Sequence, residues 1–183
     1  YEEAKAQTFY GVALMQMRRF AEALDIFNTA QKGFEIEGND YWVALLELHA
    51  ADVYLALQHY PEAQLLATRA RQGFETLGVP SRQMLSLALL ARISIALDDL
   101  EGAEHHLAQI SSIIDHTRVP LLSFPYYVPC GQVAEYKKRW TQAERAYCLA
   151  AEDLEQHQAR LQHDNLKVTF LQGRNQVYEA LVR

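Results

Sequence analysis

The fold is decided by one stretch that this chain repeats, RRFAEALDIFNTA at Arg18–Ala30. Three related stretches follow it, QHYPEAQLLATRA at Gln58–Ala70, DDLEGAEHHLAQI at Asp98–Ile110 and KRWTQAERAYCLA at Lys138–Ala150. Each copy begins 40 residues after the previous one. An internal period of about 20–50 residues is typical of a solenoid, in which one supersecondary unit is stacked repeatedly.

Three kinds of residue recur within this period. A bulky residue is followed three positions later by an alanine, and a small residue lies nine positions before the bulky one. A small residue lets a neighbouring helix approach closely, so each repeat is predicted to be two helices joined by a short turn. The recurring residues are Phe20, Tyr60, Leu100 and Trp140 (bulky), Ala23, Ala63, Ala103 and Ala143 (alanine), and Gly11, Ala51, Ala91 and Gly131 (small).

The second repeat shows the helical pattern most clearly. Apolar residues between Trp42 and Leu57 recur at steps of three and four, which indicates an amphipathic helix and not a strand. Pro61 suits the first turn of a following helix, and Gly78 suits its end. Asp40 is placed to cap the helix that contains Trp42.

These patterns predict an all-α fold. We expect a single domain, a right-handed α-solenoid of four helix hairpins with a period of about 40 residues, plus a C-terminal helix. The predicted repeats are residues 1–40, 41–80, 81–122 and 123–163, and the capping or fifth-repeat helix is residues 164–183.

The recurring residues resemble the tetratricopeptide repeat (TPR). The TPR period is about 34 residues, so a period of 40 implies longer helices. The resemblance implies stacked helix pairs that serve as a protein-binding scaffold. It is carried by Gly11, Phe20, Ala23, Phe27 and Ala30, by Ala51, Tyr60, Ala63, Ala67 and Ala70, by Ala91, Leu100, Ala103, Leu107 and Ile110, and by Gly131, Trp140, Ala143, Tyr147 and Ala150.

The last stretch, Leu166–Arg183, follows the turn-like residues His163–Asn165 and has the apolar pattern of one more helix. It resembles the helix at the end of TPR arrays that precede a CHAT domain, a caspase-like peptidase domain. The resemblance implies that this chain is the recognition arm of a larger bacterial peptidase whose catalytic His and Cys lie elsewhere. It is carried by Phe170, Arg174, Val177, Tyr178, Glu179, Leu181 and Val182.

Composition excludes some classes of function. The chain has 183 residues, of which 50% are hydrophobic and 22% charged, as is usual for a globular protein. Its formal net charge of −6 argues against a general nucleic-acid binder, which usually has a basic face. No apolar run reaches the length of a membrane span. The two cysteines, Cys130 and Cys148, do not make a disulfide framework, so we predict a cytoplasmic protein.

No pattern of catalytic residues is found. The seven histidines form neither an H-E-x-x-H motif nor a zinc-binding spacing with cysteine, and no phosphate-binding glycine loop occurs. We therefore predict no catalytic residue, no metal and no cofactor. The alternative is an enzyme fragment that uses Cys130 or Cys148. His49 lies on an otherwise apolar stripe and is interpreted as a buried histidine.

The predicted binding surface is the concave face of the solenoid, lined by the first helix of each repeat. The partner is predicted to be a protein or peptide, or another domain of the same parent protein. Asp52 and Arg92 are predicted either to pair across neighbouring repeats or to orient a ligand. The predicted groove residues form three rows: Thr8, Leu48, Ala88 and Val128; Val12, Asp52, Arg92 and Gln132; and Met15, Leu55, Ile95 and Glu135.

Two further predictions concern the partner and the parent protein. TPR domains that bind acidic chaperone C-termini have a clamp of basic residues, whereas the corresponding positions here are mostly apolar, so such a partner is not expected. An alternative parent is a bacterial signalling or transcription regulator with a TPR sensor region. The positions compared with the clamp are Thr8, Val12, His49, Leu85 and Leu89.

A proline-rich stretch at residues 117–129 breaks the regular pattern. It contains Pro120, Pro125 and Pro129, so no continuous helix is expected through it. Pro125 is predicted to lie in the first turn of the next helix, and Pro129 to distort that helix. The stretch is either an ordinary connection between repeats or a partner-facing or hinge element.

Overall fold

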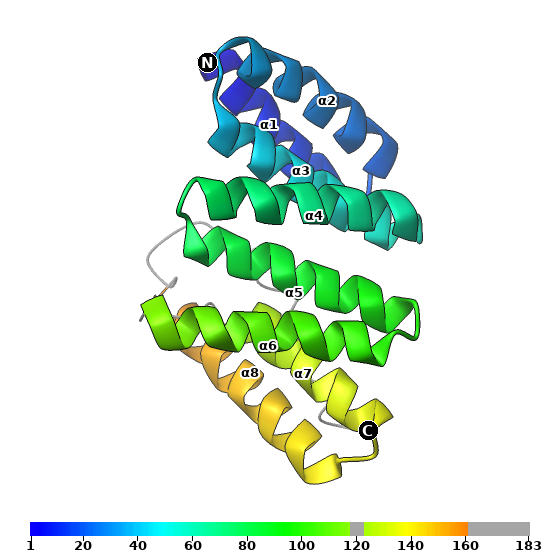
Figure 1. Ribbon diagram of the computed structural model, residues 1–183. Helices are drawn as coiled ribbons and strands as arrows, with labels where there is room; N and C mark the ends of the chain where they lie inside the picture. Colours follow the sequence, from blue (N-terminus) through cyan, green and yellow to red (C-terminus); the bar gives the residue numbers. More distant parts are fainter. Residues whose placement is uncertain (118–122, 161–183) are drawn as a thin grey trace. The chain divides into compact units, whose positions relative to one another are not determined.

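The computed structural model describes residues 1–117 and 123–160, and these form eight helices and no strand (Figure 1). The predicted all-α class and the helical repeat are thereby confirmed. The helices are α1 (Glu2–Gln16), α2 (Phe20–Ile36), α3 (Asp40–Ala56), α4 (Tyr60–Thr76), α5 (Pro80–Ala96), α6 (Leu100–Thr117), α7 (Ser123–Tyr136) and α8 (Trp140–Arg160).

The helices follow the repeat found in the sequence. The bulky residue of each copy is the first residue of α2, α4, α6 and α8, so these second helices begin 40 residues apart. The constant alanine lies one turn further on and is almost fully enclosed, with an exposure of 0% at Ala23 and 5% at Ala143. This alanine therefore lies where helices approach most closely, and a larger side chain has no room there.

Each described connection between helices is a turn of three residues with the same geometry. Its middle residue has a φ between 56° and 66°, in the left-handed region. The backbone N–H of the third residue donates to a carbonyl five residues earlier, at 2.8–2.9 Å in every case. This is the Schellman ending of a helix, which satisfies backbone carbonyls that would otherwise lack a partner.

One helix start differs from the sequence-based expectation. Asp40, predicted to cap the helix containing Trp42, is the first residue of α3. The cap is Asn39, whose Oδ1 accepts a hydrogen bond from the backbone N–H of Trp42 at 3.4 Å. The Schellman turn fixes the helix start one residue earlier than the sequence pattern indicated, and this moves the capping position from Asp40 to Asn39.

The structure divides into two compact units, Tyr1–Ile93 and Ser94–Arg183. In the first unit α1 packs on α2, α2 on α3 and α3 on α4. In the second unit α6 packs on α7 and α7 on α8. These pairs of successive helices are therefore neighbours, as expected for stacked helix hairpins.

A core cluster of the first unit combines alanine and phenylalanine with leucine and valine. Phe27 and Phe34 of α2 are buried together with Leu46 and Val53 of α3. Phe34 also stacks on Trp42, with the ring centroids 5.2 Å apart. Aromatic rings bury large apolar areas. Each Å² of apolar surface removed from water stabilises the fold by about 25 cal/mol.

The proline-rich stretch separates two helices. The helix before it, α6, ends at Thr117, and α7 begins at Ser123. Pro125 lies in the first turn of α7, as predicted. Pro129 lies inside the same helix and is buried, and α7 continues through it. Pro120 and the predicted C-terminal helix at 164–183 lie outside the described residues.

Candidate interaction surface

The small position of each first helix decides how closely the two helices of a hairpin pack. Gly11 of α1 lies against the ring of Phe27 in α2, and a Cβ added to Gly11 would be 2.5 Å from Phe27 Cε1. Gly131 of α7 lies against the ring of Tyr147 in α8 in the same way, with 2.7 Å to Cδ1. Glycine at this position therefore makes room for an aromatic ring sixteen residues later.

The first predicted row does not form a surface. Thr8, Leu48, Ala88 and Val128 have exposures of 1%, 8%, 2% and 8%, and Ile95 of the third row has 9%. Thr8 Oγ1 donates to the carbonyl of Ala4 in its own helix at 2.8 Å. This corrects the prediction for these five residues, because an enclosed side chain cannot contact a partner. They lie inside the packed helices, which are only about 8–10 Å apart.

The second predicted row is accessible in the first unit. Arg92 Nη1 donates to Asp52 Oδ1 at 2.9 Å, and both side chains are about two-fifths exposed, at 42% and 40%. The predicted pair across neighbouring repeats is therefore present. Val12 of this row is half-buried on α1. An exposed pair of this kind adds at most about 1 kcal/mol of stability, which leaves both groups available to a ligand.

The third row flanks this pair in the first unit. Met15 and Leu55 are half-buried and continue the apolar edge on α1 and α3. In the second unit Gln132 and Glu135 are also half-buried. Glu135 Oε2 accepts a hydrogen bond from the hydroxyl of Tyr147 at 3.0 Å, so this carboxylate holds its own hairpin together.

His49 contributes an aromatic contact. Its ring stacks on Phe27 with the centroids 5.8 Å apart and an angle of 21° between the planes. Burial lowers the pKa of His49 to about 4, and Asp52 opposes this shift only partly. The imidazole is therefore neutral near pH 7 and behaves as part of the packed interior.

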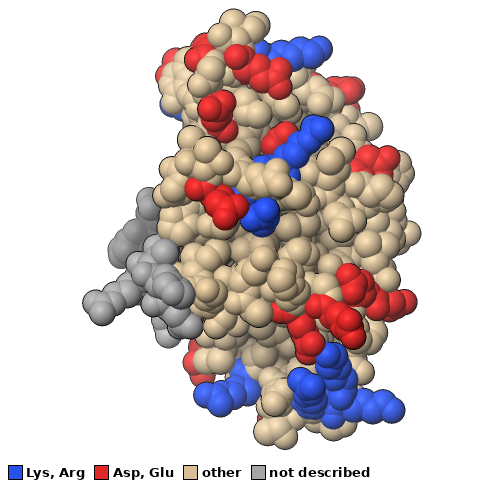
Figure 2. All heavy atoms as spheres, viewed as in Figure 1, with Lys and Arg blue, Asp and Glu red and all other residues tan. Residues whose placement is uncertain are grey.

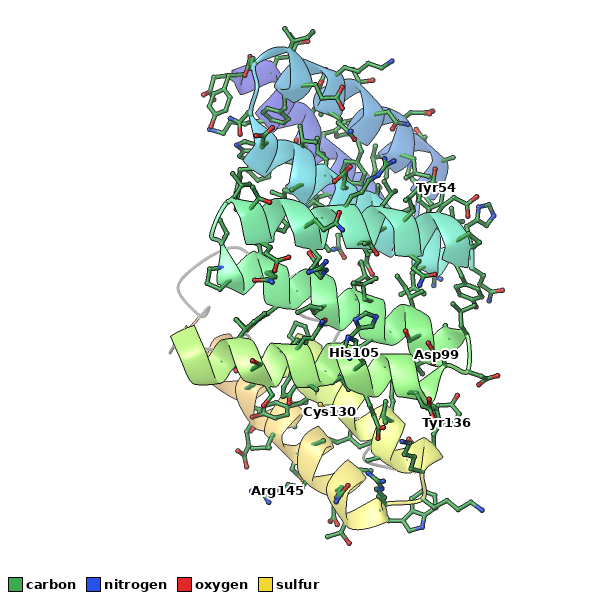
Figure 3. All side chains as sticks on the ribbon, viewed as in Figure 1. Tyr54, Asp99, His105, Cys130, Tyr136 and Arg145 are labelled. Atoms are coloured by element: carbon green, nitrogen blue, oxygen red, sulfur yellow. The ribbon has the colours of Figure 1, made fainter. Side chains whose placement is uncertain are left out.

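The thiols differ in their surroundings. Cys130, labelled in Figure 3, comes from the middle of α7 and is half-buried, and burial raises its pKa to about 11. A raised pKa disfavours the thiolate, which is the reactive form of cysteine. Cys148 is exposed on α8. Both are free thiols.

The charged residues occur in small groups of opposite sign. Figure 2 shows acidic and basic side chains side by side on the visible face. In the second unit the Glu104 carboxylate forms ion pairs with Lys137 Nζ at 2.6 Å and with Arg139 Nη1 at 3.8 Å.

The start of α6 is capped by Asp99, labelled in Figure 3. The backbone N–H of Gly102 donates a hydrogen bond to Asp99 Oδ1 at 2.9 Å.

Within residues 1–117 and 123–160, no group of three or more His, Cys, Asp or Glu side chains is arranged to hold a metal ion. None of the described helices is long and apolar enough to cross a membrane.

In comparisons with known proteins, no protein-family model and no curated protein matches the chain.

One group of exposed residues was missed by the sequence analysis. Phe9 and Tyr10 of α1 have exposures of 64% and 54%. Their positions correspond to His49 and Ala50 in the second repeat, which are not exposed. Alignment of the repeats in steps of 40 marks these positions as a helix-packing face, and two aromatic residues there were the available signal.

Proposed function

We propose that this chain is a TPR-type protein-interaction module that binds a peptide or a partner domain on the face formed by its first helices. The observation that carries this proposal is the Asp52–Arg92 ion pair of 2.9 Å. It joins equivalent positions of two consecutive repeats, so the first helices present the same face side by side. Repeats stacked in this manner give an extended binding surface.

The chemistry of this face favours an apolar segment with a polar group. Val12, Met15 and Leu55 supply half-buried apolar side chains on α1 and α3. Asp52 and Arg92 supply one carboxylate and one guanidinium, both partly exposed. A helix or an extended segment with apolar side chains at regular spacing fits such a surface, and the charged pair can orient it.

The proposal assigns no catalysis, metal or cofactor to the chain itself. The raised pKa of Cys130 supports this part of it, because an enzyme that uses a cysteine needs an accessible thiolate. We also propose a cytoplasmic setting, since the free thiols Cys130 and Cys148 suit a reducing compartment.

Selection of peptides tests the binding surface. A library of random twelve-residue peptides is selected on the unaltered chain, and enriched peptides are measured against variants. Leu55→Glu should weaken them at least tenfold, because it places a charge at the apolar edge beside Asp52. The matched control Leu65→Glu, on the exposed side of α4 at 52% exposure, should bind normally. Equal binding by both variants would move the site elsewhere.

The resemblance of Leu166–Arg183 to the segment before a CHAT domain supports a further part of the proposal, in which the module regulates a bacterial peptidase. The segment lies outside the described residues. The test is proteolysis by the complete parent protein, with and without Leu55→Glu. Altered cleavage of its substrate would support a recognition arm, whereas an attached kinase or DNA-binding domain would favour the signalling alternative.

A further inference from the structure

Helix α1 carries an exposed apolar stripe on one face. The α1 stripe consists of Ala6, Phe9, Tyr10 and Ala13, and all four residues are exposed. They are spaced at i, i+3, i+4 and i+7, so they lie on one side of the helix. Phe9 and Tyr10 have exposures of 64% and 54%, which is unusual for adjacent aromatic residues on a regular helix.

The same four positions are not exposed in any of the other first helices that the structure describes. In α3 and α5 the residues 40 and 80 positions later are buried or half-buried, and so are those of α7 in the second unit. They are Leu46, His49, Ala50 and Val53 in α3, Ser86, Leu89, Leu90 and Ile93 in α5, and Tyr126, Pro129, Cys130 and Val133 in α7. This face of a first helix is therefore a packing face in the other repeats.

The structure also shows what covers this face. Leu46 and Val53 of α3 are buried in one cluster with residues of α1 and α2, and of these two helices α3 packs mainly on α2, the second helix of the preceding hairpin. His49 of α3 stacks on Phe27 of α2 at 5.8 Å. In the second unit α7 packs on α6, again the helix before it. The element that fits the face is thus a second helix from a hairpin of this repeat.

The covering residues on such a helix have a defined pattern. Along α2 they are Phe27, Ala30 and Phe34, and the equivalent residues of α4 are Ala67, Ala70 and Phe74; all six are buried. The α4 pattern has two alanines where α2 has one. Tyr10 is larger than Ala50, its equivalent in α3, so a helix with the α4 pattern leaves more room for the tyrosine ring.

We propose that the α1 stripe is a docking surface for a further helix hairpin of this repeat type, packed through its second helix in the place that precedes α1. Docking would cover Phe9 and Tyr10 and extend the array by one repeat. The proposal concerns the packing face of α1 and is independent of the peptide-binding face proposed above.

The experiment joins a copy of residues 40–80 to Tyr1 of the complete chain. Tyr1 then takes the place of Ser81, so the step of 40 residues and the three-residue turn before the first helix are both kept. Amide hydrogen exchange of α1 is compared with that of the unextended chain. We expect amide exchange in α1 to slow at least tenfold. Once the stripe is buried, α1 can open only if the new interface is also broken, and this raises the free energy of opening.

Two variants make the test specific. Tyr10→Glu should abolish the added protection in the extended chain and leave the unextended chain's melting temperature unchanged, because the residue is exposed there. Met17→Glu, at the residue that follows α1, is the matched control, since Met17 is exposed and so are the equivalent residues Leu57 and Leu97. It should leave the added protection intact. Circular dichroism verifies that each variant is folded.

Three outcomes would overturn the proposal. The first is equal exchange of α1 in the extended and unextended chains. The second is an equal loss of stability from Tyr10→Glu in both chains, which would give Tyr10 a role within the existing fold. The third is a dimer of the unextended chain, seen by sedimentation and abolished by Tyr10→Glu, because a second copy would then cover the stripe.

Discussion

At the scale of single residues, the sequence balances size across the helix pair of a repeat. Gly11 and Gly131 lie against the aromatic rings of Phe27 and Tyr147. In the second repeat the same two positions hold the small pair Ala51 and Ala67, both fully buried. A larger side chain at one position is therefore matched by a smaller residue sixteen positions away, as close packing requires.

This matching of sizes predicts that the effect of Gly11→Ala on stability changes sign when Phe27 is replaced by leucine. Gly11→Ala adds about 1 kcal/mol of helix propensity, but its Cβ would be 2.5 Å from the buried ring of Phe27. Overpacking costs about 1–3 kcal/mol, so we expect a net loss of stability in the native background. With Phe27→Leu already present, Gly11→Ala should become stabilising.

The free energy of unfolding in urea, measured for the four proteins of this double-mutant cycle, checks that prediction. Additive effects of the two substitutions would show that the ring and the glycine are not coupled. The control is Gly33→Ala in α2, whose added Cβ would meet only the Ala4 methyl group, at 3.3 Å. It should behave alike in both backgrounds.

His49 predicts a dependence of stability on pH. Burial lowers its pKa from 6.5 to about 4, so the unfolded chain binds a proton that the folded chain does not. Stability from this residue is complete above pH 6.5 and is lost as the pH falls towards 4. The loss is on the order of 3 kcal/mol, at about 1.4 kcal/mol per pKa unit.

The check compares His49→Leu with the native chain at pH 7 and pH 4.5. Leucine is the residue at the equivalent position of the third repeat, Leu89, which is buried. Since other groups titrate in this range, the quantity of interest is the difference between the two proteins. The variant should lose less stability on acidification, and parallel curves would contradict the assignment.

At the scale of helices and turns, every described helix that leads into a turn ends with a residue in the left-handed backbone conformation. The turns within a hairpin place Arg18, Gln58, Asp98 and Lys138 in the left-handed region, whereas the turns between hairpins use Gly38 and Gly78. A residue with a Cβ is strained there by about 1–2 kcal/mol, and glycine is not. The two kinds of turn thus have the same geometry but different costs.

The turns therefore predict opposite effects for two substitutions. Gln58→Gly should stabilise the chain by about 1 kcal/mol because it relieves the strain at a φ of 62°. Gly78→Ala should destabilise it by about the same amount, although an added Cβ there meets nothing within 4 Å. Thermal unfolding of both variants measures this. Equal effects of the same sign would mean that contacts, not backbone strain, govern the turns.

At the scale of the whole molecule, stacked repeats contact only their neighbours, so damage is expected to stay local. Ala23→Asp buries an unpaired carboxylate at a position of 0% exposure and should cost more than about 3 kcal/mol. Ala21→Asp, two residues earlier on the exposed side of α2, is the matched control and should be neutral.

Amide hydrogen exchange resolves where that damage occurs. In Ala23→Asp the amides of α1 and α2 should exchange much faster, while those of α7 and α8 in the second unit keep most of their protection. Uniform loss of protection along the chain would contradict nearest-neighbour stability. Unchanged exchange in α1 and α2 would contradict the burial of Ala23.

Much of this protein could be predicted from its sequence, because the repeat is local. Helix starts at the bulky residues, burial of the constant alanine and the Asp52–Arg92 pair all follow from a step of 40 residues. Spacing along a helix fixes which side chains share a face, and identical repeats place equivalent residues side by side.

Only the tertiary structure decided which faces are covered. Thr8, Leu48 and Ala88 were expected in a groove, yet neighbouring helices enclose them, whereas Phe9 and Tyr10 are exposed although equivalent positions are buried elsewhere. A sequence pattern shows that a face is apolar. Whether water or another helix lies against that face depends on the packing of elements distant in the chain, and local spacing carries no information about that packing.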